Sequence, residues 1–114
     1  MCAAKHRLAN LTAMVDYNKL QSYGTTAEVL DLEPLADKWR AFGWCVREID
    51  GHDMAAIVDA LDDLPYATDA PSLLIAHTIK GKGVSFAEDT YLWHNNAVTD
   101  EILANALTEL GDPA

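Results

Sequence analysis

Residues 71–83 read PSLLIAHTIKGKG, and this stretch decides the fold. The part from 72 to 78 is a continuous apolar run between a proline and a glycine-rich segment, which is typical of a strand buried on both faces. Outward along the chain, 11–16 (LTAMVD) is a second short apolar run of the same kind. The segment 44–49 (WCVREI) alternates enough for a strand that is partly exposed. Three strands are therefore expected.

Helical patterns alternate with these strands. Apolar residues recur at i, i+4 and i+7 from Leu35 to Phe42, Pro34 suits a first helical turn, and Gly43 suits the C-terminal stop. Strands that alternate with helices indicate an α/β fold, a parallel sheet with helices on both faces. Two further helices are expected over 54–64, capped by Asp53, and over 100–110, capped by Thr99.

Length and charge limit the classes of function. The chain has 114 residues and a formal net charge of −10, which argues against a nucleic-acid partner. We interpret 1–114 as one domain, N-terminally incomplete because 3–10 has helical composition without a capping signal before it. No apolar run reaches the length of a membrane span, and the start lacks the apolar core of a signal peptide. A cytoplasmic protein with Cys2 and Cys45 reduced is expected.

In a parallel α/β sheet, ligands bind outside the carboxyl ends of the strands. The segment 16–21 (DYNKLQ) offers there the amide oxygen of Asn18 and the backbone carbonyl of Leu20. Neutral oxygens at this spacing suit Mg²⁺, which takes few carboxylates and completes its shell with phosphate oxygens and water. By spacing alone, a plain Asx turn after the strand is the more common explanation.

The segment 79–83 (IKGKG) places Lys80 and Lys82 among glycines on an otherwise acidic chain. Lysine is a compact point charge for a phosphate group. An exposed turn with two solvated lysines explains the same pattern.

Four histidines differ in what their surroundings predict. His6 has no predicted role, His52 fits a helix start, and His77 fits a hydrogen-bonded residue of the buried strand. His94 stands in a long aperiodic loop, a type of segment that often carries functional residues. By spacing alone, an ordinary surface histidine remains the default for His94.

Four motifs in succession resemble the thiamine-diphosphate-binding domain of transketolase, in particular the smaller N-terminal subunit of enzymes split between two genes. Their order and spacing agree with that family over about eighty residues, and the succession is more specific than any single motif. The motifs are MVDYNKLQ (14–21), PLADKWRAFGWCVREIDGHD (34–53), PSLLIAHTIKGKGVSFAED (71–89) and WH (93–94).

The resemblance implies a partial thiamine-diphosphate-binding fold and a set of site residues. Asn18 and the Leu20 carbonyl would be ligands of Mg²⁺ (or Ca²⁺), and Asn18, Gln21, Lys80 and His94 would bind the cofactor. His94 would also be the catalytic residue, facing the reacting carbon and the sugar. The helix and strand around KWRAFGW would hold the fold, which predicts core positions for Trp39, Phe42 and Trp44.

The activity implied is that of a transketolase, which transfers a two-carbon ketol unit between sugar phosphates in the pentose phosphate pathway. Three parts of the family pattern are absent from the sequence: the upstream G-D-G motif, an upstream region that carries a histidine, and the pyrimidine-binding region. The stretch Asn95–Asn96 also replaces the glycine that usually follows the family's histidine. We therefore expect a complementing subunit or domain that carries the pyrimidine-binding region, and no activity without it.

Two alternatives stay open. One is another thiamine-diphosphate enzyme, such as a protein similar to deoxyxylulose-phosphate synthase. The other is a non-catalytic remnant or interaction module that keeps the same fold.

Overall fold

The computed structural model describes residues 1–111, and the chain divides into two compact units. The first unit consists of residues 1–17 and 32–78, and the second consists of residues 18–31 and those from 79 onward. Within the described residues, no helix has the length and apolar character needed to cross a membrane. The interpretation of the whole chain as one N-terminally incomplete domain stays a prediction.

A three-stranded parallel sheet forms the centre of the first unit. Its strands are β1 (Thr12–Tyr17), β5 (Ser72–His77) and β4 (Cys45–Asp50), in the order β1-β5-β4. Thr12 of β1 and Cys45 of β4 both align with Ser72 of β5, so the three carboxyl ends reach the same edge. The three strands confirm the predicted ones to within one residue at each end.

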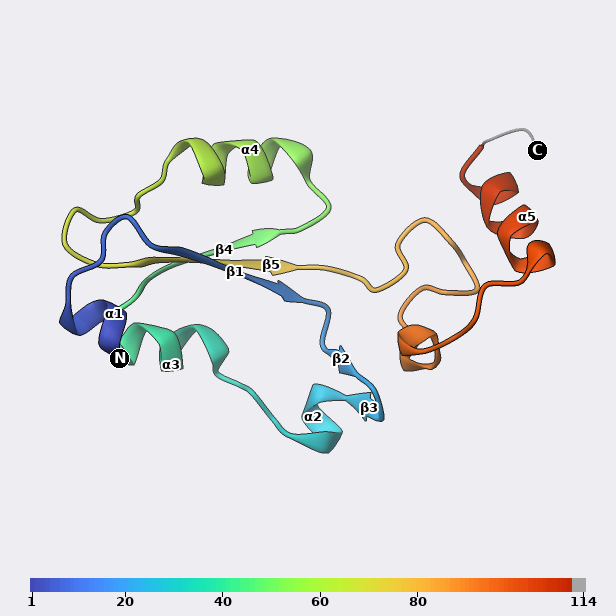
Figure 1. The fold of residues 1–114 in the computed structure, drawn as a ribbon, viewed down its shortest axis with the longest axis horizontal. Coiled ribbons are helices and arrows are strands. Elements are labelled where there is room, and N and C mark those ends of the chain that lie inside the picture. The colour runs from blue at the N-terminus through green and yellow to red at the C-terminus, as the bar shows by residue number, and fades with distance from the viewer. Residues whose placement is uncertain (112–114) are drawn as a thin grey trace. The chain divides into compact units, whose positions relative to one another are not determined.

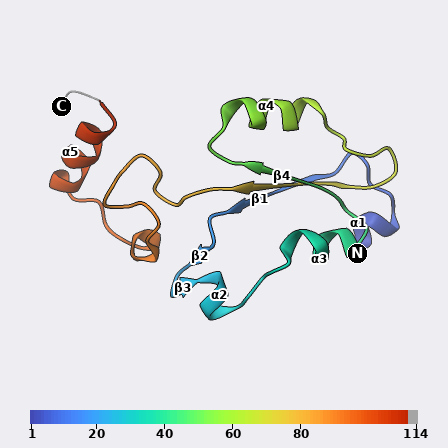
Figure 2. The ribbon, with the colours of Figure 1, turned by 180° about the vertical axis from the view of Figure 1, so that it is seen from behind.

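Helices cover both faces of this sheet. Figure 1 shows α4 (Met54–Asp62) on one face and α3 (Leu35–Ala41) on the other, and Figure 2 shows the same arrangement from behind. Asp53 caps α4 as predicted, since its Oδ1 accepts the backbone N–H groups two and three residues onward at 2.9 and 3.2 Å. The helical composition of 3–10 gives only a short helix, α1 (Cys2–Lys5). The expected α/β fold is confirmed.

The core of the first unit surrounds β5, the strand with a neighbour on each side. Leu73 and Ile75 are 0% and 1% exposed, and Tyr17 of β1 completes the buried cluster. Trp39 and Trp44 pack edge to face with ring centroids 4.9 Å apart. The partly buried apolar residues against this cluster are Ala13, Val15, Leu32, Leu35, Ala36, Trp39, Trp44 and Val46.

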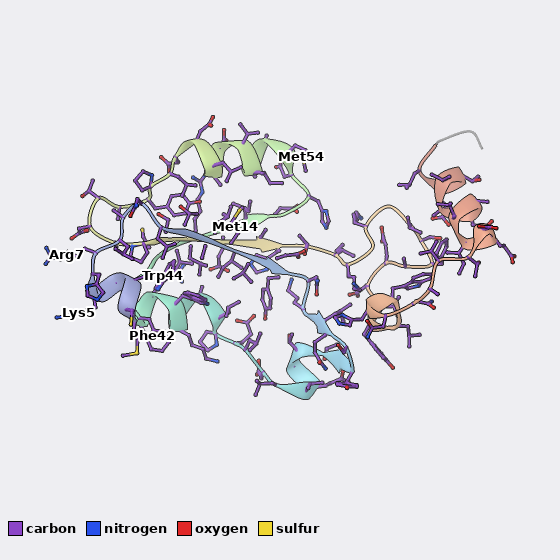
Figure 3. The ribbon with its side chains drawn as sticks, viewed as in Figure 1. Lys5, Arg7, Met14, Phe42, Trp44 and Met54 are labelled. Carbon is purple, nitrogen blue, oxygen red and sulfur yellow. The ribbon has the colours of Figure 1, made fainter. Side chains whose placement is uncertain are left out.

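Two predictions about burial are wrong. The apolar run 11–16 predicts a strand buried on both faces, but exposed and partly buried residues alternate along β1, and Met14 is 61% exposed. Among residues 1–111, β1 has a neighbouring strand on one side only. Phe42, predicted in the core, is 51% exposed because it is the C-cap residue, one position after α3 ends. Figure 3 labels Met14 on β1 and Phe42 beside α3.

The second unit contains short elements joined by loops. Its elements are β2 (Leu20–Gln21), β3 (Gly24–Thr25), α2 (Thr26–Val29), the 3-10 helix η1 (Tyr91–His94) and α5 (Asp100–Glu109). β2 and β3 pair antiparallel as a hairpin, which corrects the prediction of a loop over 16–26 from its polar residues. The cap of α5 is as predicted, because Thr99 Oγ1 accepts the N–H of Ile102 at 3.3 Å.

Candidate functional site

Asn18 lies directly after β1, in a turn with fixed geometry. Its Oδ1 accepts the backbone N–H of Leu20 at 2.9 Å, which is the Asx turn allowed by the spacing. Lys19 adopts a left-handed conformation (φ 63°), and its carbonyl accepts the N–H of Thr26 at 2.8 Å. Because an amide oxygen has two lone pairs, the turn leaves one lone pair of Asn18 Oδ1 for a cation. The turn and a metal-ligand role are therefore compatible.

The hairpin that carries Leu20 and Gln21 is held at its far end by a capping box. Thr25 Oγ1 accepts the N–H of Glu28 at 3.2 Å, and Glu28 Oε2 accepts the N–H and the hydroxyl of Thr25 at 3.1 and 2.8 Å. The hydroxyl of Thr25, followed by its backbone N–H, lowers the pKa of the Glu28 carboxyl. The pattern T-x-x-E, which begins near the end of the loop predicted over 16–26, signals this box in the sequence.

Gln21 carries a polar group without a visible function in the fold. Its side-chain Nε2 is buried and meets no hydrogen-bond acceptor among the residues that the structure describes. A buried donor without an acceptor costs about 1–3 kcal/mol, and such groups are rare in folded proteins. Within residues 1–111, this nitrogen therefore carries the cost of burial without a hydrogen bond that offsets it.

The two lysines of the glycine-rich segment differ in their surroundings. Lys82 Nζ lies 3.6 Å from Glu88 Oε1, and the same oxygen accepts the N–H of Gly83 at 2.9 Å. Lys80 is half-buried, and its Nζ pairs with no carboxylate in residues 1–111. Gly81 has φ 74°, and a Cβ at this position would overlap the carbonyl of Ala87, so the segment requires glycine there. Lys80 is thus the lysine whose charge is available to an anion.

His94 lies at the end of η1, which neighbouring side chains hold in place. Thr90 Oγ1 accepts the N–H of Leu92 at 3.3 Å, and Trp93 Nε1 donates to the carbonyl of Phe86 at 2.9 Å. The rings of Phe86 and Trp93 lie 5.5 Å apart between centroids. His94 itself is exposed, and within the described chain no hydrogen bond or ion pair fixes its ring. Its segment is positioned while its imidazole is open to a ligand.

All five predicted site residues belong to the second unit. β2, with Leu20 and Gln21, packs against η1, which ends at His94, so these two parts of the predicted site are brought together. Lys80 is in the same unit, and its carbonyl accepts the N–H of Asp89 at 3.0 Å. The roles of these residues toward a ligand stay predictions.

The donor set fits a hard cation that shares its shell with a ligand. Among the described residues, no three or more His, Cys, Asp or Glu side chains gather as a metal cluster. Asn18 Oδ1 and the Leu20 carbonyl are neutral oxygens two residues apart, a set that needs the oxygens of a bound anion to complete a magnesium shell. These residues are therefore compatible with a metal held together with a diphosphate.

The carboxyl ends of the strands in the first unit are occupied by structural contacts. His77 Nε2 lies 3.0 Å from Glu48 Oε2, which confirms it as a partnered histidine. The hydroxyl of Thr78 donates to Asp16. Asp50 Oδ1 accepts the N–H of His52 at 2.8 Å and closes the predicted turn before α4.

One feature of the first unit has no signal in the sequence patterns. A cavity of about 230 Å³ lies against α3 and the sheet, with Tyr17, Glu33 and Arg40 among its lining residues. The Tyr17 hydroxyl donates to Glu33 Oε1 at 2.7 Å, and the N–H of Leu35 donates to Glu33 Oε2 at 2.9 Å. The bond from Leu35, followed by that from Tyr17, lowers the pKa of the Glu33 carboxyl. These contacts join the start of α3 to β1.

Comparison with curated proteins finds relatives among transketolase subunits. The chain is 48% identical over 110 residues to the 6-deoxy-6-sulfo-D-fructose transketolase subunit SqwG of Clostridium sp. (strain MSTE9), covering 96% of this chain and 40% of that protein. It is 42% identical over 112 residues to an apulose-4-phosphate transketolase subunit of Phocaeicola vulgatus, covering 98% of this chain and 40% of that protein. The chain thus spans about two fifths of the length of these relatives.

A solved structure has the same fold. The transketolase of Campylobacter jejuni superposes with a TM-score of 0.86 at 28% sequence identity, over 96% of this chain and 17% of that one. Residues 1–113 match the family described as the thiamine diphosphate binding domain of transketolase. The chain therefore belongs to the family of transketolase thiamine-diphosphate-binding domains.

Proposed function

We propose that this chain is part of one subunit of a two-subunit transketolase, which transfers a two-carbon ketol unit between sugars. The observation that carries the proposal is the packing of β2 against η1, which joins the predicted cation ligand Leu20 to the segment that ends at His94. The two relatives described above support it, since both are named as transketolase subunits. Their names contain a sulfonated and a phosphorylated sugar, which favours substrates with an anionic end.

In this proposal, Asn18 and Leu20 hold the metal end of the cofactor. Asn18 Oδ1 and the Leu20 carbonyl would bind Mg²⁺ (or Ca²⁺), and diphosphate oxygens and water would complete the shell. Lys80 would place its charge near the diphosphate, since no carboxylate of the described chain neutralises it. Gln21 would contact the cofactor through its side-chain amide.

His94 would serve the reacting end. Bound thiamine diphosphate supplies a nucleophilic carbon and an electron sink for a carbanion. The imidazole of His94 is exposed at the end of a positioned segment, so it can reach the oxygens of a bound sugar. An imidazole can both donate and accept a hydrogen bond, so His94 would orient these oxygens and move a proton at them.

The proposed partner is a complementing subunit or domain that carries the pyrimidine-binding region. The relatives' designation as transketolase subunits supports a partner chain. The proposed location is the cytoplasm. Placement in the pentose phosphate pathway, which the resemblance implies, stays a prediction because the relatives' names concern other sugars.

Calorimetric titration tests the proposal. Thiamine diphosphate with Mg²⁺ is titrated into the chain alone and into the chain mixed with the protein from the neighbouring gene. We expect heat of binding in the mixture, its loss in the Asn18→Ala variant, and ketol transfer from a phosphorylated or sulfonated ketose in the mixture only. Turnover by the purified chain alone would refute the need for a partner.

The alternative function is that of a non-catalytic module of the same fold. Such a module would associate with the partner without binding thiamine diphosphate. Absence of binding both alone and in the mixture, together with co-elution of the two chains, would support the module and refute the enzyme.

A further inference from the structure

One edge of the sheet in the first unit carries backbone groups that pair with no strand of the described residues. β1 pairs with β5 alone among residues 1–111. The carbonyls of Tyr17 and of Leu11, the residue before β1, accept backbone N–H groups of the β5 segment at 3.4 and 3.0 Å. Backbone groups alternate in direction along a strand, so those of Thr12, Met14 and Asp16 face the open edge.

The opposite edge of the sheet, formed by β4, is protected by charge. Arg47 and Glu48 stand in β4, and both take part in ion pairs. Charged side chains on an edge strand are a common means of preventing further strands from pairing with it. β1 has one charged residue, Asp16, whose carboxylate accepts the hydroxyl of Thr78. β1 is therefore the edge to which another strand can add.

An apolar surface lies next to this open edge, on the face of the sheet that α4 covers. Both neighbours of Met14 pack against the core cluster on the side of α3, so Met14 points to the opposite face, where it is 61% exposed. α4 packs against β4, which is separated from β1 by β5. Along α4, the exposed residues Met54, Val58 and Leu61 form an apolar stripe at helical spacing. Figure 3 labels Met14 and Met54 on this side of the sheet.

An open groove of about 520 Å³ joins the end of α4 to the start of β1. Leu64 and Pro65 line it from the side of α4, and Thr12 lines it from the side of β1. The N–H of Leu64 donates to the carbonyl of Leu61 at 3.3 Å, so the apolar stripe continues into the groove. Met14, the stripe and the groove together are called the β1–α4 surface below. Contiguous exposed apolar surfaces of this kind mark contacts with other proteins.

Two observations indicate what covers the β1–α4 surface. Asp59 and Asp62 are exposed on α4 beside the stripe, and the chain has a net charge of −10, so a second copy would bring like charges together. The chain matches 40% of the Clostridium relative, so the larger part of that protein has no counterpart in residues 1–114. The surface therefore fits a different polypeptide, with basic side chains opposite the two aspartates.

We propose that the β1–α4 surface binds a segment of another polypeptide, in which a strand pairs with β1 and an amphipathic helix with basic flanks covers Met14 and the stripe. The segment corresponds to the part of the relatives that residues 1–114 do not match. In such strand addition, backbone hydrogen bonds supply affinity and side-chain contacts supply specificity. The surface belongs to the first unit and the predicted cofactor residues to the second, so the proposal does not depend on cofactor binding.

Co-expression tests the proposal in the absence of cofactor. The chain is produced together with the part of the Clostridium relative that it does not match, and the complex is purified through a tag on the chain. Sedimentation equilibrium gives the Kd of the complex, and hydrogen exchange reports on the backbone amides of β1. The variants are Met14→Lys and Val58→Lys. Val98→Lys is the matched control, because Val98 is an exposed valine of the second unit.

We expect a complex with the wild-type chain, in which the amides of Thr12, Met14 and Asp16 exchange at least about tenfold more slowly than in the free chain. Met14→Lys and Val58→Lys should weaken the complex about tenfold or more, because each would bury a charge in an apolar contact. Val98→Lys should bind like the wild type. Both side chains are exposed in the free chain, so its Tm should not change. If one variant does not fold, the other decides.

Three results would overturn the inference. Absence of a complex with the wild-type chain would mean that this surface does not take the segment. An unchanged Kd in both variants would place the contact elsewhere on the chain. Self-association of the chain that Met14→Lys abolishes would make a second copy the occupant. Each of these results leaves the proposed function standing, since that function is tested separately by the binding of thiamine diphosphate.

Discussion

The comparison of Lys80→Ala with Lys82→Ala tests the candidate site directly, because the two lysines are two residues apart and differ in ion pairing and in burial. Lys82 Nζ is 3.6 Å from Glu88 Oε1, at a half-exposed position. Lys80 is half-buried and has no carboxylate partner in the described chain. Each variant removes one positive charge from the same segment. Only the removal at position 80 should be felt by a bound anion.

The expected magnitudes follow from these contacts. A hydrogen bond between charged groups is worth about 1.5–3 kcal/mol, so loss of Lys80 should weaken the binding of thiamine diphosphate by about 10–150-fold. Lys82 is already neutralised by Glu88, and an exposed ion pair contributes about 0–1 kcal/mol. Its loss should change the Kd by less than about fivefold.

Calorimetric titration of Mg²⁺ and thiamine diphosphate into the chain mixed with its complement measures both values. The titrations are repeated at rising KCl concentration, because screening should reduce the contribution of Lys80. Equal losses in the two variants would refute the assignment of Lys80 and would indicate a diffuse effect of net charge. A larger loss in Lys82→Ala would mean that the ion pair with Glu88 opens when the ligand binds.

Three further predictions concern the fold that carries the site. In urea denaturation, Leu73→Ala should lower the free energy of unfolding by about 2–5 kcal/mol, because Leu73 is 0% exposed. Met14→Ala should lower it by less than about 0.5 kcal/mol, because Met14 is 61% exposed. Similar losses in the two variants would contradict the central position of β5. Asp53→Ala should cost about 1 kcal/mol through loss of the α4 cap, and an unchanged urea midpoint would exclude that role. The pKa of Glu28 is lowered from 4.5, so the stability that this carboxylate adds is present above pH 4.5 and is lost as the pH falls through its folded value. Glu28→Gln should therefore flatten the acid side of the pH–stability curve, and an unchanged curve would refute the contribution.

The parts of the fold that were predictable are those with a local physical cause. The run 72–78 is continuous and apolar because its strand is central and covered by a helix on each face, so pattern and burial agree. The caps by Asp53 and Thr99 depend on side chains within three residues of the groups that they bind. Such short-range contacts are encoded in the order of the residues.

The errors concern contacts that depend on more distant residues. The run 11–16 has the apolar composition of a buried strand, but its exposure is set by which neighbours β1 has, and composition does not determine that number. Phe42 continues the apolar spacing of α3, but the helix ends one residue earlier, and that single position turns the ring outward. At helix ends and sheet edges, the apolar pattern of the sequence does not determine which side chains are buried.

For the candidate site, the spacing of the motifs predicted which residues take part. The structure adds how the surroundings of these residues differ. The spacing treats Lys80 and Lys82 alike, and only the position of Glu88 separates them. Gln21 is predicted through the family resemblance, whereas its buried, unpartnered nitrogen depends on packing that no motif describes. The capping box at Thr25 had a signal in the pattern T-x-x-E.

The two ends of the site differ in how much geometry this chain supplies. At the metal end, Asn18 Oδ1 is already fixed by its bond to the N–H of Leu20, so the oxygens are placed before any cation binds. At the other end, Trp93 anchors the segment through its bond to Phe86, while the His94 ring has no described partner. A ring with this freedom gains a defined orientation only from groups that another chain or a substrate provides. Loss of the partner should therefore reduce turnover far more than it reduces the binding of inorganic diphosphate with Mg²⁺, and equal losses would contradict this division.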